Sequence, residues 1–398
     1  MQTDSSPSIA AGLWRIGRES QGPKRPLLCL ALLMSLKSFV YRHRLLSKRT
    51  IAWLARVLPT SASRRLRALA ERIAFNVTPQ YQSETLPPIF HYWSARFLAP
   101  DARRLGIDSP EALFIDHVRR RFAETGRPVK VLSVGTGACS MEIAMALELK
   151  AEEITAEVIC IDFNPTLMRK AAEAAREQGV GDRIAFHRAD CNQPFELPEQ
   201  DVIIVNQFFH HVTELETCCQ SLRRSLAPDG VLLSSDIVGR NGHMLWPDVE
   251  TMVQHAWSSL PPSKRYDRHF NKWMERYRPI NHAAYSNEGV RAQDVVGCLL
   301  AEFDFELFFT FGGAIMPFVE RRIGFNFDPK QAEDCAWIDR LQGDDAAALT
   351  SARYPASNMI AALRHRGCVA EAQYEPVMPA QHVALTRQQL DQLSEAGH

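Results

Sequence analysis

The chain of 398 residues is 46% hydrophobic and 23% charged, which is the composition of an ordinary soluble globular protein. That length is enough for one large domain with additions, or for two domains. The formal net charge is zero, but residues 1–75 carry 14 Lys or Arg and 3 Asp or Glu, a net charge of +11. The rest of the chain is therefore acidic on balance, which confines a basic, anion-attracting surface to the N-terminal segment.

The nine cysteines are scattered along the chain, with no C-x-x-C pair and no Cys/His cluster at zinc spacing. Two of them, Cys218 and Cys219, are adjacent on a predicted helix. We therefore predict reduced thiols in a cytoplasmic protein, most of them buried as small hydrophobes, and no metal site.

Residues 1–85 are predicted to form a basic helical extension. Its apolar run, residues 27–36, is too short to span a bilayer, which takes about 20 residues. Residues 27–58 have two interpretations: a helical subdomain packed on the core or on a second subunit of a homodimer, or an interfacial anchor with snorkelling Lys and Arg. We favour the packed subdomain. The anchor would hold a cytoplasmic protein at the inner face of a membrane.

Aromatic side chains, among them Tyr92 and Trp93, crowd residues 86–100, just before the core. They either close over a bound ligand and help to exclude water, or form a hydrophobic plug between the N-terminal helices and the core. The first interpretation makes Tyr92 and Trp93 substrate-binding residues.

The core begins with a run of β-formers, Val129 to Val134, which predicts a strand buried on both faces. The run breaks at Gly135-Thr136-Gly137, where the glycines permit a tight turn and a close approach of ligand to backbone. Ser140 is the predicted N-cap of the next helix. A strand, a glycine turn and a helix N-terminus in this order indicate the ligand side of a doubly wound α/β sheet.

Polar side chains follow the next three predicted strands. Asp162 ends one strand, about 20–25 positions after the glycines, where a carboxylate is placed to accept both hydroxyls of a ribose. Asp190, after a short strand, can accept from an adenine amine, and Asn206 ends a third strand. Because parallel strands bind ligands at their carboxyl ends, these residues predict one site at one sheet edge.

Residues 129–238 resemble the core of a class I, seven-stranded S-adenosylmethionine-dependent methyltransferase. The matching residues are Gly135-Thr136-Gly137, Asp162, Asp190-Cys191, Asn206 and the turn from Leu226 to Gly230. The resemblance implies a mostly parallel, Rossmann-like seven-stranded sheet with an antiparallel edge hairpin, and S-adenosyl-L-methionine as cofactor.

The resemblance also implies a role for each cofactor-binding residue. Gly135, Gly137 and Asn206 would take the methionine part, Asp162 the ribose, Phe163 one adenine face and Asp190 the adenine amine; Thr136 and Cys191 complete the set.

Methyl transfer from a sulfonium requires positioning, exclusion of water and, for a hydroxyl acceptor, removal of a proton. His210 and His211 directly follow the Asn206 strand, and a neutral imidazole suits a general base. They could equally pack or cap a helix, and His243 and His282 are rival bases.

Regular strand–helix alternation stops after Val238. The insert, residues 239–289, is rich in aromatic and histidine residues, and residues 261–282 carry a net charge of +4. We predict a helical lid over the carboxyl edge of the sheet; the alternative is a helical hairpin with ordinary packing. The predicted substrate-binding residues are Tyr92, Trp93, Asp236, Trp246, His282 and Tyr285. Asp236 could instead orient a base.

The domain is predicted to span residues 86–325, with its core at 129–238, the insert at 239–289, and a last helix and an edge hairpin at 290–325. The hairpin is expected to turn at Gly312-Gly313. Residues 326–398 are predicted to be C-terminal helices, one of them carrying Met359, Ile360 and Leu363, followed by a partly ordered tail.

The predicted function is methyl transfer to a small organic acceptor, on oxygen rather than nitrogen. One alternative is a nucleic-acid methyltransferase that uses the basic N-terminal segment; another is a non-catalytic docking subunit. Nucleic acid is the less favoured acceptor, because base-amine enzymes often carry Asn/Asp-Pro-Pro-aromatic where this chain has Asn206-Gln207-Phe208-Phe209.

Overall fold

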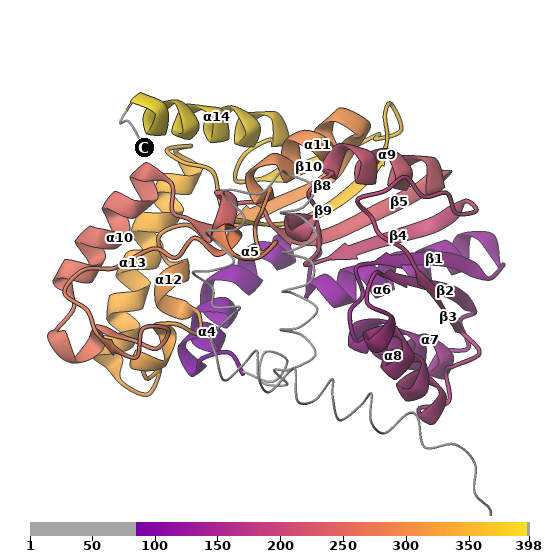
Figure 1. Ribbon diagram of the computed structural model, residues 1–398, viewed down its shortest axis with the longest axis horizontal. Coiled ribbons are helices and arrows are strands. Elements are labelled where there is room, and N and C mark those ends of the chain that lie inside the picture. Colours follow the sequence, from indigo (N-terminus) through magenta and orange to yellow (C-terminus); the bar gives the residue numbers. More distant parts are fainter. Residues whose placement is uncertain (1–84, 396–398) are drawn as a thin grey trace, which may run out of the picture. The chain divides into compact units, whose positions relative to one another are not determined.

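The computed structural model of the protein describes residues 85–395 (Figure 1). The predicted basic extension, including residues 27–58, lies outside this range apart from its last residue. Within the described range, no helix is both long and apolar enough to cross a membrane.

One eight-stranded sheet organises the described chain, in the order β10-β8-β9-β5-β4-β1-β2-β3. Its strands are β1 (Val129–Val134), β2 (Ala156–Asp162), β3 (Ile184–Arg188), β4 (Gln200–Asn206), β5 (Leu226–Ile237), β8 (Phe303–Phe311), β9 (Asn358–His365) and β10 (Gln373–Glu375). The first five run parallel, and β9 is antiparallel to both of its neighbours. The predicted mostly parallel α/β sheet is confirmed, with eight strands in place of the predicted seven.

Helices cover both faces of the sheet, as the near-continuous apolar strands require. One face packs against α6 (Pro110–Thr125), α7 (Ser140–Ala151) and α8 (Pro165–Glu177). The other packs against α9 (Leu215–Ser225) and α11 (Val295–Glu302), and α14 (Pro379–Glu395) lies on α11. Asn164 caps α8 as predicted, since its Oδ1 accepts from the backbone N–H groups of Thr166 and Leu167.

The antiparallel partner of β8 is not the predicted one. β8 ends at Phe311, and Gly312-Gly313 lead into α12 (Met316–Val319) instead of turning a hairpin. The partner is β9, the segment predicted to be helical. Its run from Met359 to Leu363 is buried throughout, and a short apolar run cannot be told from a buried helix by periodicity alone. Residues 373–395, predicted to lie largely in a loose tail, form β10 and α14.

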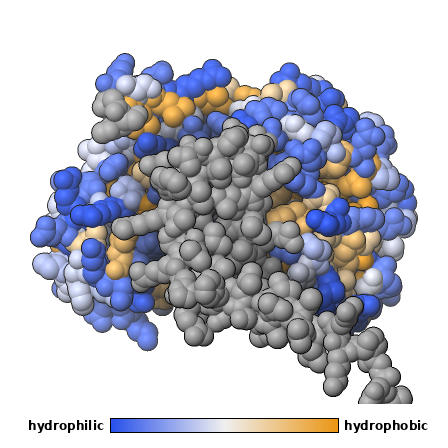
Figure 2. Space-filling model, in the orientation of Figure 1, coloured by the Kyte–Doolittle hydropathy of each residue, from blue (hydrophilic) through white to orange (hydrophobic). Residues whose placement is uncertain are grey.

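A separate helical core lies beside the sheet. It joins α4 (Pro88–Trp93), a π-helix (Ser94–Leu98) and α5 (Ala99–Arg104) to α10 (Pro247–Ser259), α12 and α13 (Ala332–Thr350). Figure 1 shows α4, α10, α12 and α13 together at the left. The insert is therefore mixed: α10, 3-10 turns and the small antiparallel pair β6 (Tyr266–Asp267) and β7 (Lys272–Trp273). On the face in Figure 2 the described surface is largely hydrophilic.

Candidate active site

The glycine turn after β1 has the backbone conformation that the sequence requires. Gly135 and Gly137 have φ angles of 72° and 53°, in the left-handed region where glycine carries no Cβ penalty. A Cβ on Gly135 would lie 2.0 Å from the Phe208 ring, whereas one on Gly137 would meet open space. Cys139 is also left-handed, at 54°, and takes the N-cap position predicted for Ser140. The turn therefore presents a bare backbone beside the N-terminus of α7.

Asp162, at the end of β2, ties this turn to the next strand. Its Oδ2 accepts from the backbone N–H of Gly137 at 2.9 Å, and its Oδ1 from that of Asn164 at 2.7 Å. Burial raises the pKa of Asp162, while these hydrogen bonds oppose the shift. A carboxylate offers about four lone-pair sites, so Asp162 keeps capacity to accept a ribose hydroxyl beside its backbone hydrogen bonds.

The remaining predicted cofactor residues occupy the same edge of the sheet. Phe163 follows Asp162 and is half-buried, and the half-buried Asn206 ends β4. Asp190 is exposed just beyond β3, while the neighbouring Cys191 packs into the core under α9. An open glycine turn, a helix N-terminus and two acids at neighbouring strand ends fit an adenosine-containing cofactor.

The second part of the site is the turn after β4, which Asp236 holds in place. Asp236 is the last residue but one of β5 and is fully buried. Its Oδ2 accepts from the backbone N–H groups of Phe208 and Phe209, and its Oδ1 lies 2.6 Å from His210 Nδ1. The prediction that Asp236 binds substrate is therefore wrong, because a fully buried carboxylate already committed to these groups cannot reach one; it orients His210.

Glu288, at the end of the insert, gathers three imidazoles. Its Oε1 lies 3.4 Å from Nε2 of both His210 and His243, and its Oε2 lies 3.6 Å from Nε2 of His211. Sequence reasoning missed Glu288, although its place three residues after Tyr285 in the histidine-rich insert was a usable signal. We call His210, His211, His243 and Glu288 the histidine cluster.

Burial and charge act differently on the members of the cluster. Burial alone would lower the pKa of His210, but Asp236 and Glu288 raise it to about 10. Burial lowers the pKa of His243 to about 4. Burial also disfavours the charged form of Glu288, yet the neighbouring imidazoles hold the pKa of this carboxyl well below its usual range. Near neutral pH the cluster therefore contains a protonated His210, a neutral His243 and an ionised Glu288.

Two predicted substrate residues join this cluster. The rings of His243 and His282 lie 5.5 Å apart, and Tyr285 Oη is 3.1 Å from His282 Nδ1. His282 and Tyr285 therefore lie beside the histidine cluster, and their role in substrate binding stays a prediction.

Tyr92 and Trp93 are not brought to the cluster. Tyr92 Oη donates to Asp339 at 2.9 Å, and Trp93 Nε1 donates to Gln342 at 2.6 Å, so both fasten α4 to α13. The alternative interpretation, a plug against the N-terminal helices, concerns residues outside the described range; within that range the partner of both side chains is α13. Trp246 is buried in the same helical core but also lines a small cavity beside His243.

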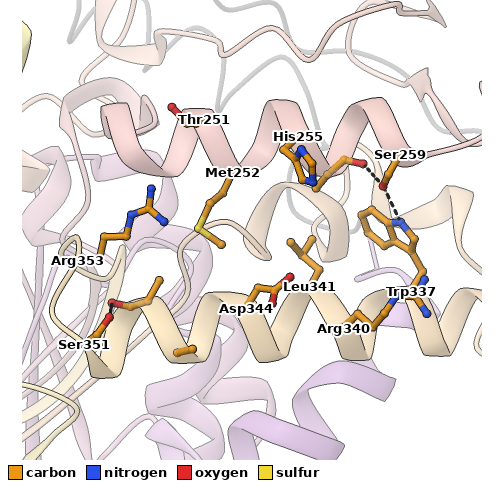
Figure 3. Close-up of a pocket in the computed structure, with 13 residues that line it drawn as sticks. Thr251, Met252, His255, Ser259, Trp337, Arg340, Leu341, Asp344, Ser351 and Arg353 are labelled. Atoms are coloured by element: carbon orange, nitrogen blue, oxygen red, sulfur yellow. Dashed lines mark hydrogen bonds between the residues drawn. The ribbon is translucent and has the colours of Figure 1, made fainter.

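Two cavities flank the helical core. The larger, about 810 Å³, lies between α10 and α13, where Trp337 Nε1 donates to Ser259 Oγ at 3.2 Å (Figure 3). It contains none of the predicted site residues. The smaller, about 110 Å³, is lined by His243, Trp246, Arg240 and Tyr277 among others. Of the two, the smaller one adjoins the histidine cluster.

Residues 127–288 match the family model described as a methyltransferase domain. These residues contain the glycine turn, the acids at the strand ends and the whole histidine cluster. Residues 127–288 are a class I S-adenosylmethionine-dependent methyltransferase domain. Its cofactor is S-adenosyl-L-methionine, in agreement with the resemblance.

Curated relatives match this methyltransferase domain over part of their length. The ribosomal protein L11 methyltransferase of Geobacter sp. (strain M21) is 33% identical over 140 residues, 35% of this chain and 40% of that protein. A non-reducing polyketide synthase of Penicillium rubens is 25% identical over 142 residues, 35% of this chain and 5% of that protein. The chain thus spans less than half the length of these relatives.

Solved structures with a related fold include a geranyl diphosphate methyltransferase in complex with SAM, at 10% identity and a TM-score of 0.36 over 64% of this chain and 84% of that one. Another is the glycopeptide N-methyltransferase MtfA complexed with sinefungin, at 18% identity and a TM-score of 0.26. The match covers 32% of this chain and 55% of that one. TM-scores this low do not bear on the function of the present methyltransferase domain.

Proposed function

We propose that the methyltransferase domain transfers its methyl group to an oxygen atom of a small organic acceptor, with His211 as general base. The observation that carries the proposal is the position of His211. It is 24% exposed, its Nε2 lies 3.6 Å from Glu288 Oε2, and it is close enough to Asp162 of the cofactor site for the two side chains to interact electrostatically. A base between the cofactor and a partly open surface can take the proton of an acceptor hydroxyl.

His210, which was predicted as a possible base, suits a positioning role instead. Held between Asp236 and Glu288, with its pKa raised to about 10, it is already protonated near neutral pH. A protonated imidazole has no lone pair with which to accept a proton. His210 therefore acts as a positioning residue that holds Glu288, and Glu288 in turn orients His211.

The size of the acceptor is inferred from the cavity beside His243. At about 110 Å³ it suits a small group, and its lining includes Arg240. Arg240 is partly buried, and burial lowers the pKa of its guanidinium, although the group stays charged near neutral pH. A partly desolvated guanidinium favours a carboxylate partner. A small hydroxy acid or phenolic acid fits this lining.

Two basic residues of the insert, Lys264 and Arg265, are held in internal contacts and are not available to a phosphate backbone. Lys264 pairs with Asp334 on α13 at 2.6 Å, and Asp267 of the insert pairs with Arg322, which follows α12. Arg265 donates to the backbone carbonyl of Leu260. These cations hold the insert on α13 and its neighbours, which supports a discrete acceptor over an extended nucleic acid.

The test is transfer of a labelled methyl group from S-adenosylmethionine to a panel of small hydroxy acids, phenols and matching amines. We expect transfer to oxygen, with the product atom identified by NMR. His211→Ala should lower turnover by about 10²–10⁴ and leave cofactor affinity nearly unchanged.

The matched control is His255→Ala, an exposed histidine on α10 outside the cluster, which should keep full turnover. Methylation on nitrogen, or full activity of His211→Ala, would contradict the proposal.

The net charge of +11 on residues 1–75 favours one competing acceptor, a nucleic acid. Salt-dependent RNA retention by the full chain, together with methyl transfer to that RNA, would replace the small-molecule proposal.

A further inference from the structure

Three side chains of the histidine cluster point their donor atoms at one another from separate segments. His210 comes from the turn after β4, His243 from the start of the insert and Glu288 from its end. Their potential ligand atoms all lie within 4.8 Å of one another. We propose that His210, His243 and Glu288 bind one divalent transition-metal ion.

The distances suit a cation shared by the three groups. Nε2 of His210 and Nε2 of His243 are each 3.4 Å from Glu288 Oε1. That is longer than an ordinary N–H···O hydrogen bond of about 2.7–3.2 Å. Two ligands at about 2.0–2.1 Å from a tetrahedral metal are separated by about 3.4 Å. The ion needs only small side-chain movements to reach all three atoms. It would displace the proton that His210 Nε2 carries in its absence, since a metal-binding imidazole nitrogen must be deprotonated.

A second-shell carboxylate already orients the first ligand. Asp236 Oδ1 lies 2.6 Å from His210 Nδ1, which places the other nitrogen, Nε2, toward Glu288. A carboxylate behind a metal-binding imidazole fixes the ring and its tautomer in the same way. Asp236 is itself fixed by two backbone N–H groups, so His210 is pre-organised.

His243 supplies an independent observation. Its Nε2 is buried and makes no hydrogen bond in the structure. A buried imidazole nitrogen without a hydrogen bond costs about 1–3 kcal/mol, a cost that a bound ion would remove. His243 also has a left-handed backbone, with φ of 58°, a conformation that is uncommon for residues other than glycine.

The donor set indicates the class of ion. Two imidazoles and one carboxylate suit zinc, iron(II), manganese(II) or cobalt(II), whereas magnesium and calcium prefer all-oxygen sites. Three protein ligands leave at least one position open. An acceptor hydroxyl at that position would have a lowered pKa and lie near His211; this role rests on the proposed function, whereas binding of the ion does not.

The experiment uses the full chain, stripped with a chelator and titrated with cobalt(II) or zinc(II) alone. We expect one ion per chain by calorimetry, and a cobalt(II) absorption spectrum typical of mixed nitrogen and oxygen ligands. His243→Ala and Glu288→Gln should each weaken binding by about 10²-fold or more, and Asp236→Asn by about 10–100-fold. His255→Ala, the exposed histidine control, should bind the ion as the wild type does.

The stripped chain should still bind S-adenosylmethionine, and this separates loss of the ion from loss of the methyltransferase site. Absence of stoichiometric binding by the stripped wild type would overturn the proposal. Wild-type affinity in both His243→Ala and Glu288→Gln, with melting curves that show both variants folded, would overturn it as well.

Discussion

Gly135 is the residue on which the cofactor turn depends most closely. Its backbone is left-handed, and a Cβ there would overlap the Phe208 ring. Gly135→Ala should therefore lower the free energy of unfolding by about 2–4 kcal/mol and weaken S-adenosylmethionine binding. Adding Phe208→Ala should recover part of the stability, because it removes the clash and leaves the backbone strain. Denaturant unfolding of both variants checks this; a wild-type midpoint for Gly135→Ala would contradict it.

At the scale of residues, the sequence predicts best those side chains that a short motif fixes. Asn164 and Pro165 begin α8 as expected, since a cap acts on backbone groups two and three positions away. Glu288 was missed because its partners are 45 to 78 positions away, and spacing along the chain carries no signal for such contacts. Tyr92 and Trp93 were misassigned because their partners Asp339 and Gln342 lie on a distant helix.

At the scale of elements, α13 contains a glycine that the fold does not require. Gly343 lies inside this helix, is exposed, and would place a Cβ in open space. Gly343→Ala should raise the free energy of unfolding by about 0.5–1 kcal/mol, because alanine loses less backbone entropy in a helix.

Gly106→Ala is the matched control for this change. A Cβ there would also meet open space, but φ is +77°, so the same substitution should destabilise by about 1–2 kcal/mol. Thermal melting of both variants distinguishes the two effects; shifts of the same sign would contradict the reasoning.

Among the elements, the strands differ in how well the sequence predicts them. The strands β1, β2, β4 and β5 follow from continuous apolar runs, each ending at a turn or polar residue. β9 could not be recognised in this way, because its pairing with β5 and β8 decides its conformation, and both partners are far away in the sequence. Tertiary pairing overrides local propensity in such short apolar segments.

At the scale of the whole molecule, a buried histidine links stability to pH. His382 on α14 is 1% exposed and lies edge-on to Phe308, and burial lowers its pKa to about 4. In the unfolded chain the His382 imidazole becomes protonated near pH 6.5, whereas in the folded chain it stays neutral down to about pH 4. The unfolded state therefore binds more protons in that window, and stability falls as the pH drops through it.

The expected loss from His382 is about 3 kcal/mol between pH 6.5 and 4, at about 1.4 kcal/mol per unit of pKa difference. His117 and His243 also have lowered pKa values and act in the same direction. His382→Leu should flatten the dependence of unfolding free energy on pH, measured by denaturant titration at several pH values. An unchanged slope would show that His382 is not buried as a neutral side chain.

The claim on which the account rests is that S-adenosylmethionine binds at the glycine turn and Asp162. Calorimetric titration of the full chain tests it most directly. Asp162→Ala should weaken binding by about 1.5–3 kcal/mol, the range of charge-assisted hydrogen bonds, or roughly 10–150-fold. Asp182→Ala, an exposed acid before β3, should bind as the wild type does. Unchanged affinity in a folded Asp162→Ala variant would contradict the account.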